Sequence, residues 1–308
     1  MHDTIGEETV SMAEHINSKT DMLSRILKKM MKETTYTPTD RYEKWRTKPL
    51  HGQFPRMVNE IGTSQTWQWL KGSNIKGPTE GLIIAAQDQC LMTNSYRKEI
   101  LKQNVSPNCR MCHTRPETIN HILSECSTMA LKQYLIRHNN IARSIHWSLC
   151  NKYNIKTDAR WYEHQPEKNK VMENEHVKIL WDFSIQTDKV ISARRPDITV
   201  VNKTAKTVTI IDVAVPADKR VSLKETEKIE KYKDLAIELT RIWGMRTRII
   251  PVVVGALGTL SSNSEKWVKE LHASITNKDI QRIALLGSAF ILRRVLGKYE
   301  GAVASGSG

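Results

Sequence analysis

The period of the apolar positions changes near the middle of the chain. In the second half, three short runs rich in β-branched residues predict strands: KILWDFSIQTD, PDITVVNKTAKTVTIIDVAV and RTRIIPVVVGAL. The middle run is expected to fold back on itself through residues 202–206. Helical stretches alternate with these runs, so the pattern predicts an α/β (α+β) domain in which helices flank a mixed sheet.

Helical periodicity marks the stretches around these strands. One apolar stripe predicts a long helix over about residues 222–243, and an apolar, basic stretch predicts a last helix over about 278–297. In the first half, the stretch 67–100 predicts a buried helix from the spacing of Leu82, Ile83, Ala86, Cys90 and Leu91. A further amphipathic helix is predicted near the N-terminus by Leu23, Ile26, Leu27 and Met30.

A polar, charged segment, KYNIKTDARWYEHQPEKNKVMENE, separates the two halves and places a domain boundary near residue 165. We therefore expect a helical, basic arm over 1–65 and a helical connector over 66–165. An α/β domain is expected over 166–299, and the segment 300–308 is expected to be a flexible tail.

Charge narrows the choice of partner. The chain has 308 residues, with 47 Lys and Arg against 33 Asp and Glu, which gives a formal net charge of +14. Such an excess favours polyanions, nucleic acid first, with an anionic membrane surface or an acidic protein as the alternative. No apolar run is long enough to span a bilayer, and the first residues lack the pattern of a secretory signal. These features predict an intracellular protein without a membrane partner.

The cysteines cluster in a way that suits a metal better than disulfides. Three of the five lie within CRMCHTRPETINHILSEC, which contains Cys109, Cys112, His121 and Cys126. Zinc takes four tetrahedral thiolate and imidazole ligands, and this spacing matches a turn followed by a short helix. His113 is the alternative histidine, but it adjoins Cys112, so His121 is preferred. The other two cysteines, Cys90 and Cys150, are expected to be core residues.

A closed four-ligand site of this kind is expected to be structural. Basic residues surround it in the sequence and are expected to form a phosphate-binding surface. They are Arg110, Arg115, Lys132, Arg137, His138 and Arg143.

Two aspartates in the predicted hairpin are candidates for a second metal site. Asp197 stands at the head of one strand and Asp212 interrupts the apolar run TVTIIDVAV. Paired carboxylates bind Mg²⁺ through oxygen, and a buried carboxylate is costly unless it is paired or holds a metal. The alternatives are a turn role for Asp197, which follows Pro196, and a purely structural role for Asp212.

The long helix predicted over 222–243 adds cations to this site. At about 100° per residue, Lys228 falls near the centre of the apolar stripe, with Lys224 and Lys231 towards its edges. An inward lysine beside the aspartates would stabilise charge on a phosphate or help to activate water. The alternative is a lysine whose stem is buried while its ammonium reaches solvent. Tyr232, one turn after Lys228, is interpreted as a packing residue.

Together these motifs resemble the C-terminal region of non-LTR retrotransposon polyproteins, which carry a restriction-like endonuclease of the PD-(D/E)xK family. The likeness covers about residues 65–299 and is carried by the Cys-Cys-His-Cys knuckle (109–126), RRPDI, IIDVAVP and EKIEKYKDL. In that family the nuclease nicks target DNA, and the exposed 3′ end primes reverse transcription of the element's RNA.

The resemblance implies a function for each motif. Asp197 and Asp212 would bind catalytic Mg²⁺ or Mn²⁺, and Lys228 or Lys231 would be the family's lysine. Arg194 and Arg195 would contact nucleic acid together with the basic residues of the knuckle, whose zinc is structural. The partners would be DNA and the element's RNA, and the DNA substrate implies a nuclear location.

The chain departs from the family pattern in two places. Ala214 occupies the position where the general D-x-K pattern has lysine, so the lysine must come from the helix. The acidic pair of a reverse transcriptase is also missing from the sequence. The first reading is therefore a metal-dependent DNA endonuclease, and the second is an inactive, zinc-dependent nucleic-acid-binding protein of the same origin.

Overall fold

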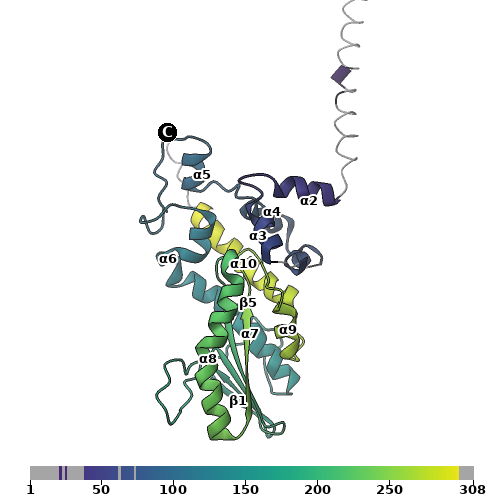
Figure 1. Ribbon diagram of the computed structural model, residues 1–308, viewed down its shortest axis with the longest axis vertical. Coiled ribbons are helices and arrows are strands. Elements are labelled where there is room, and N and C mark those ends of the chain that lie inside the picture. The colour runs from purple at the N-terminus through teal and green to yellow at the C-terminus, as the bar shows by residue number, and fades with distance from the viewer. Residues whose placement is uncertain (1–20, 23–24, 26–37, 62–63, 73, 298–308) are drawn as a thin grey trace, which may run out of the picture. The chain divides into compact units, whose positions relative to one another are not determined.

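The computed structural model describes residues 21–22, 25, 38–61, 64–72 and 74–297 (Figure 1). The chain divides into two compact units, 1–55 and 56–308, and each is described by itself. The amphipathic helix expected around residues 23–30 and the tail expected over 300–308 lie outside the described residues. In the first unit, helix α2 (Pro38–Arg46) is followed by α3 (Gln53–Ile61), which crosses the division.

The second unit is built on a mixed sheet, as the sequence predicts. Its strands lie in the order β1 (Val171–Glu173), β2 (Val177–Trp181), β3 (Ile198–Asn202), β4 (Thr207–Ala214) and β5 (Arg246–Val253). The first three pairings are antiparallel, and β4 pairs with β5 in parallel. The predicted hairpin is confirmed, because β3 and β4 are adjacent and joined by a turn at residues 203–206.

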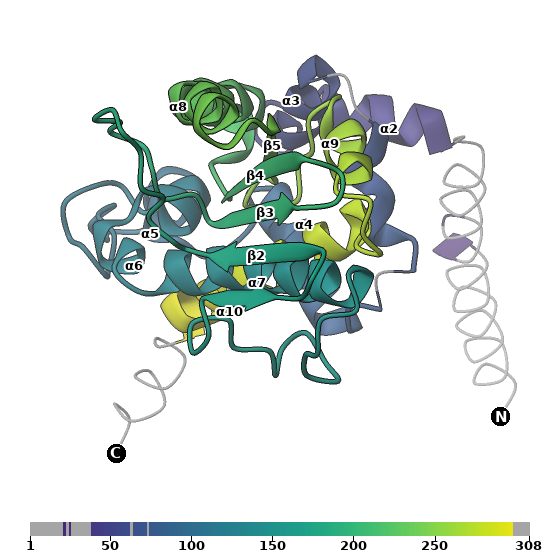
Figure 2. The ribbon, with the colours of Figure 1, turned by 90° about the horizontal axis from the view of Figure 1, so that it is seen from below.

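Helices cover both faces of this sheet (Figures 1 and 2). Helix α8 (Val221–Trp243) makes the crossover between the parallel strands β4 and β5, and its Tyr232, Leu235 and Leu239 pack on one face. Helices α7 (Gln133–Lys152) and α10 (Asn277–Leu296) contribute to the core on the other face. Both long helices predicted from the second half of the sequence are therefore confirmed.

The remaining elements are short, and no helix in the described part of the chain is long and apolar enough to cross a bilayer. They are η1 (Ser64–Leu70), α4 (Gly77–Gln87), α5 (Asn94–Glu99), η2 (His121–Glu125), α6 (Ser127–Ala130), η3 (Asp218–Arg220) and α9 (Ser264–Glu270).

The helix predicted in the stretch 67–100 is shorter than its apolar spacing indicates. Ile83 and Ala86 are buried in α4, as expected. The helix ends at Gln87, and the backbone then turns through Gln89, which has a φ of 57°. Cys90 therefore lies beyond the helix and is half-buried, so the expectation that it is a core residue is wrong.

The main core does not follow the domain boundary expected near residue 165. Ile141, Ile145 and Leu149 of α7 share one cluster of buried side chains with Ile179 of β2 and Ile211 of β4. The division between the two compact units falls instead after Pro55. Helix α7 therefore belongs with the sheet, although a polar segment separates them in the sequence.

The two edges of the sheet differ. Strand β1 has three residues. At the other edge, Pro251 of β5 is the residue in register with Asp212 of β4, and α9 packs against β5. Pro251 is buried.

Candidate functional site

The side chains predicted to bind zinc come together in the structure. The ligand atoms of Cys109, Cys112, His121 and Cys126 all lie within 4.8 Å of one another. The Sγ atoms of Cys109 and Cys126 are 3.9 Å apart, and Cys112 Sγ is 3.3 Å from His121 Nε2. Ligands of one tetrahedral zinc ion are separated by about 3.8 Å for two thiolates and about 3.6 Å for thiolate and imidazole. This cluster could therefore hold a zinc ion, with His121 rather than His113 as its histidine.

Local backbone geometry brings the last two ligands together. The predicted short helix is present as η2, a single π-helical turn between His121 and Cys126. The Cys126 N–H donates to the His121 carbonyl at 2.8 Å, five residues back. Such turns are rare and often occur at functional sites. The hydroxyl of Tyr134 accepts from the Cys126 N–H at 3.1 Å and donates to the Ile122 carbonyl at 2.8 Å, which anchors this turn to α7.

The thiols of the cluster differ in acidity. Burial raises the pKa of Cys109 to about 11. Burial acts in the same direction on Cys112, but hydrogen bonds from Thr114 and His121 outweigh it and lower the pKa of Cys112 to about 6. Cys112 is therefore the more readily ionised of these two thiols at neutral pH.

The second candidate site centres on Asp212 of β4. Because side chains alternate along a strand, Asp212 points to the same face as Val208 and Ile210, which pack against α8. Its side chain is only 2% exposed. The Tyr232 hydroxyl donates to Asp212 Oδ1 at 2.6 Å. The ammonium of Lys228 forms an ion pair with Oδ2, although no described side chain gives this oxygen a hydrogen bond of standard geometry.

Both lysines expected at this site reach it from α8. The Lys228 side chain is 15% exposed, which confirms that it points inward. Lys231 is more exposed, lies 3.7 Å from Asp212 Oδ1 and donates to the Tyr232 hydroxyl at 2.8 Å. Residues three and four positions apart share one helix face, so Lys228, Lys231 and Tyr232 meet the same carboxylate. Lys224 instead pairs with Glu227 on its own helix.

Asp197 lies beside Asp212 across the hairpin. It stands one residue before Ile198, which pairs with Ile211, so the two aspartates occupy the next rung of the β3–β4 ladder. Asp197 Oδ2 accepts the Val213 N–H at 2.6 Å and lies 3.1 Å from His138 Nε2 on α7. The same His138 nitrogen is 3.1 Å from the Val213 carbonyl oxygen. Two oxygens therefore converge on the place that His138 Nε2 occupies.

His138 and Asp197 each stabilise the charged form of the other. Burial alone would lower the pKa of His138, but the hydrogen bond and the negative charge of Asp197 raise it above its ordinary value. Burial likewise acts to raise the pKa of Asp197, yet His138, the Val213 N–H and Lys228 together lower it. Asp197 is therefore a carboxylate at neutral pH.

Two of these residues have roles that the sequence did not reveal. Tyr232 is a hydrogen-bond donor to Asp212, not only a packing residue. A tyrosine that is expected to be buried one turn from Lys228 needs a hydrogen-bond partner for its hydroxyl. This need could have indicated a contact between Tyr232 and Asp212. His138 was grouped with the basic residues of the knuckle, and nothing in its own surroundings along the chain points to Asp197.

Of the basic residues expected to contact nucleic acid, Arg137 is buried and Arg110 is half-buried in an ion pair, which corrects that expectation. The Arg110 side chain is 9% exposed and forms an ion pair with Glu117 at 2.6 Å. Arg137 is 2% exposed and donates to Ser288 Oγ and to the Leu123 carbonyl, both at 2.8 Å. Cations withdrawn from solvent need such partners, so these two arginines connect parts of the fold.

The other basic residues are partly or fully exposed. Arg143 forms an ion pair with Glu167 at 2.8 Å, and Arg115 lies 3.7 Å from Glu125. Exposed ion pairs are weak and leave arginine free to exchange partners. Nucleic-acid contacts therefore stay a prediction for Arg115, Lys132, Arg143, Arg194 and Arg195.

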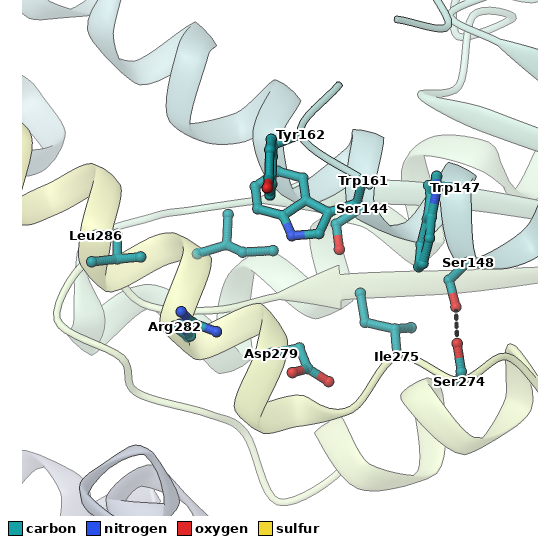
Figure 3. Close-up of a pocket in the computed structure, with 11 residues that line it drawn as sticks. Ser144, Trp147, Ser148, Trp161, Tyr162, Ser274, Ile275, Asp279, Arg282 and Leu286 are labelled. Atoms are coloured by element: carbon teal, nitrogen blue, oxygen red, sulfur yellow. Dashed lines mark hydrogen bonds between the residues drawn. The ribbon is translucent and has the colours of Figure 1, made fainter. Parts of the chain in front are cut away.

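A cavity of about 460 Å³ lies between α7 and α10 (Figure 3). Trp147, Trp161 and Tyr162 form much of its wall, and a hydrogen bond joins Ser148 and Ser274 at 2.9 Å. None of the residues of the knuckle or of the aspartate site lines it.

No protein-family model matches this chain, and neither does any curated protein. The chemistry of the knuckle and of the aspartate site therefore carries the functional conclusion.

Proposed function

We propose that this chain is a metal-dependent DNA endonuclease of retrotransposon origin, with a zinc knuckle that binds nucleic acid. The observation that carries the proposal is Asp212, a carboxylate buried in a strand and faced by Lys228, Lys231 and Tyr232, with Asp197 beside it. A cluster of buried carboxylates in contact with lysines is more typical of a site that acts on phosphates than of a structural core.

The oxygen atoms of the site fit a hard divalent cation. Asp197 Oδ2 and the Val213 carbonyl already converge on one nitrogen, and Asp212 Oδ2 has no standard hydrogen bond from a described side chain. Mg²⁺ and Mn²⁺ prefer carboxylate and carbonyl oxygens. Asp197 and Asp212 would hold the ion, which would supply an activated water and offset the charge of a phosphate.

The lysines of α8 would stabilise the charge on the phosphate. Lys228 and Lys231 place two ammonium groups at the carboxylate, where they would stabilise negative charge that develops on a phosphodiester. Ala214 is buried against Val221 and Val253, so a lysine at position 214 would point into an apolar cluster. The site thus draws its lysines from α8 where the general D-x-K pattern places one on the strand.

The knuckle and the net charge of +14 support a nucleic-acid substrate. We propose that its zinc is structural, because three thiolates and one imidazole leave no open position. The partners would be DNA and RNA of the element, and the protein would act in the nucleus.

A second candidate function is nucleic-acid binding without cleavage. It is favoured by the ion pairs, because Lys228 compensates Asp212 and His138 compensates Asp197 without any metal. Under this alternative the aspartates would only stabilise the fold.

Nicking of supercoiled plasmid with Mg²⁺ or Mn²⁺ separates the two functions. We expect cleavage by the wild-type protein and a loss of at least about 100-fold in Asp212→Asn, the size typical for a group that acts on the reacting phosphate. Asp234→Asn, an exposed change on the same helix as the lysines, is the matched control and should cut normally. Salt-sensitive DNA binding with no metal-dependent cutting by any variant would leave the binding function in its place.

A further inference from the structure

A second group of histidine and cysteine side chains lies apart from the sites above. His146 and Cys150 stand one turn apart on α7, and His164 comes from the segment that follows this helix. Their exposed fractions are 0%, 0% and 3%. One nitrogen or sulfur atom from each lies within 4.8 Å of the others. Three polar groups thus meet in a buried place.

The distances within the group are close to those of a metal site. His146 Nδ1 is 3.5 Å from Cys150 Sγ and 2.8 Å from His164 Nε2. Ligands of a tetrahedral zinc ion are separated by about 3.6 Å for nitrogen and sulfur and about 3.3 Å for two nitrogens. The first distance already fits, and the second would fit after the rings move apart by about half an ångström.

The neighbours of His164 direct a lone pair into the group. Its Nδ1 lies 2.8 Å from Thr157 Oγ1 and 3.5 Å from Asp158 Oδ2. The negative charge of Asp158 favours a proton on Nδ1, which Nδ1 then donates to Thr157 Oγ1, and this leaves the Nε2 lone pair facing His146. A histidine whose second ring nitrogen donates to an outer hydrogen-bond partner is the usual arrangement of a metal ligand.

The far side of the His146 ring offers no competing partner. No described residue gives its Nε2 a hydrogen bond, and the Trp181 ring packs against the imidazole at 85° with ring centroids 5.7 Å apart. Without a metal, the 2.8 Å between His146 Nδ1 and His164 Nε2 fits one N–H···N hydrogen bond, which needs a proton on His146 Nδ1. Moving that proton to the unpartnered Nε2 of His146 would leave two lone pairs facing each other, an arrangement that a cation beside both would stabilise.

We propose that His146, Cys150 and His164 bind a second zinc ion, with water as its fourth ligand. Imidazole and thiolate are the ligands that zinc prefers, and a site with three protein ligands keeps one position open. An open pocket of about 550 Å³ reaches His164, and this is the side from which the ion and the water would enter.

The ion has a structural role to play here. Residues 153–170 contain no helix or strand, and irregular segments of this length are uncommon unless something holds them. A zinc ion on His164 would fix this segment to His146 and Cys150 of α7. The site is independent of the proposed nuclease activity, because none of its three residues contacts Asp197 or Asp212.

Zinc content of the full-length protein tests the proposal. Protein purified without chelators is measured by elemental mass spectrometry, together with three single variants. We expect two zinc ions per chain in the wild type, one in Cys150→Ser and one in Cys112→Ser, which lacks a ligand of the knuckle. Cys90→Ser also removes one thiol, but from outside both groups, and should keep two.

Cobalt substitution gives a second reading on the same proteins. The thiolate-to-cobalt absorption of the wild type should fall in Cys150→Ser and be unchanged in Cys90→Ser. Unchanged zinc content in Cys150→Ser would overturn the proposal and leave a hydrogen-bonded group of buried side chains. If Cys150→Ser does not fold, as judged by circular dichroism, the zinc content of Cys112→Ser is used instead. One zinc ion per chain in that variant supports the proposal, and none overturns it.

Discussion

At the scale of single residues, Asp212 is a buried charge that depends on its neighbours for compensation. Its carboxylate is buried in β4, and the Tyr232 hydroxyl and the Lys228 ammonium compensate it from α8. Removing one partner of a buried ion pair costs far more than the pair contributes net, because the remaining charge stays desolvated. The two lysines of the site should therefore differ in their effect on stability.

Replacing Lys228 by methionine should destabilise the protein by about 3 kcal/mol, because it leaves Asp212 without its buried cation. The matched change, Lys231→Met, should cost less than about 1 kcal/mol, since Lys231 is 45% exposed and 3.7 Å from the carboxylate. Urea denaturation of both variants measures the difference. Equal losses would mean that the two lysines share the task.

The His138–Asp197 pair gives the stability a pH dependence. The pKa of His138 is raised in the folded protein, so its contribution is present below the unfolded pKa of about 6.5 and is lost as pH rises through the folded value. The pKa of Asp197 is lowered, so its contribution is lost as pH falls below about 4.

The stability lost in His138→Asn should therefore be largest between about pH 4 and 6.5, at about 1 kcal/mol, and should shrink towards pH 9. Urea denaturation of wild type and variant in magnesium-free buffer across this range measures it. A difference that grows with pH would show that the two residues do not form an ion pair.

Predictions about single residues succeeded where the residue is unusual for its own stretch of sequence. An aspartate inside TVTIIDVAV and a lysine at the centre of an apolar stripe both stand out along the chain, and the structure brings Asp212 and Lys228 together. His138 has no such local anomaly, because its partner Asp197 lies 59 residues further on. The burial of Arg137 was equally hidden, since it depends on Ser288 of α10.

Between elements, helices α7 and α10 approach each other closely at Gly287. A side chain at Gly287 of α10 would meet Arg137 of α7, whose Cγ lies 2.7 Å from the position of an added Cβ. Gly81 of α4 has no atom within 4 Å of that position. Gly287 therefore has no space for a side chain, whereas Gly81 has.

Alanine at position 287 should destabilise the protein by about 1–3 kcal/mol, because the buried Arg137 stem cannot move aside. Alanine at position 81 should stabilise it by about 0.5–1 kcal/mol, the ordinary gain of alanine over glycine in a helix. Thermal unfolding of both variants gives the two signs. A stabilised Gly287→Ala protein would show that the helices can separate without cost.

Periodicity predicted the long helices of the second half and the β3–β4 hairpin, but it did not predict how α7 assembles with the sheet. The stripe over 222–243 became α8 (Val221–Trp243), and the run RTRIIPVVVGAL contains β5 (Arg246–Val253). The polar segment KYNIKTDARWYEHQPEKNKVMENE looked like a linker between domains. It instead lies within one unit and contains β1, and Ile141, Ile145 and Leu149 of α7 pack on the sheet beyond it. Long-range packing of this kind leaves no periodic trace in the sequence.

For the whole molecule, the net charge of +14 sets how nucleic acid would bind. Each phosphate neutralised by a cation releases a condensed counterion, so affinity falls with salt in proportion to the number of contacts. With about six such contacts, DNA affinity should fall about a thousand-fold between 50 and 200 mM salt.

Fluorescence anisotropy with a labelled duplex measures this salt dependence. Double substitution of the exposed Arg194 and Arg195 by glutamine should flatten the slope, whereas substitution of Glu117 or its partner Arg110 should act on folding instead. Affinity that does not change with salt would argue against binding through phosphates.

The edges of the sheet have a consequence for how this protein behaves when concentrated. An open edge strand is a template on which another chain can add a strand and begin to aggregate. Strand β1 offers only three residues, and β5 carries Pro251, which has no N–H to donate, under the cover of α9. Both edges of the sheet are thus poor templates, so we expect the protein to resist strand-to-strand aggregation even at the high local concentration that the proposed binding to a polyanion would create.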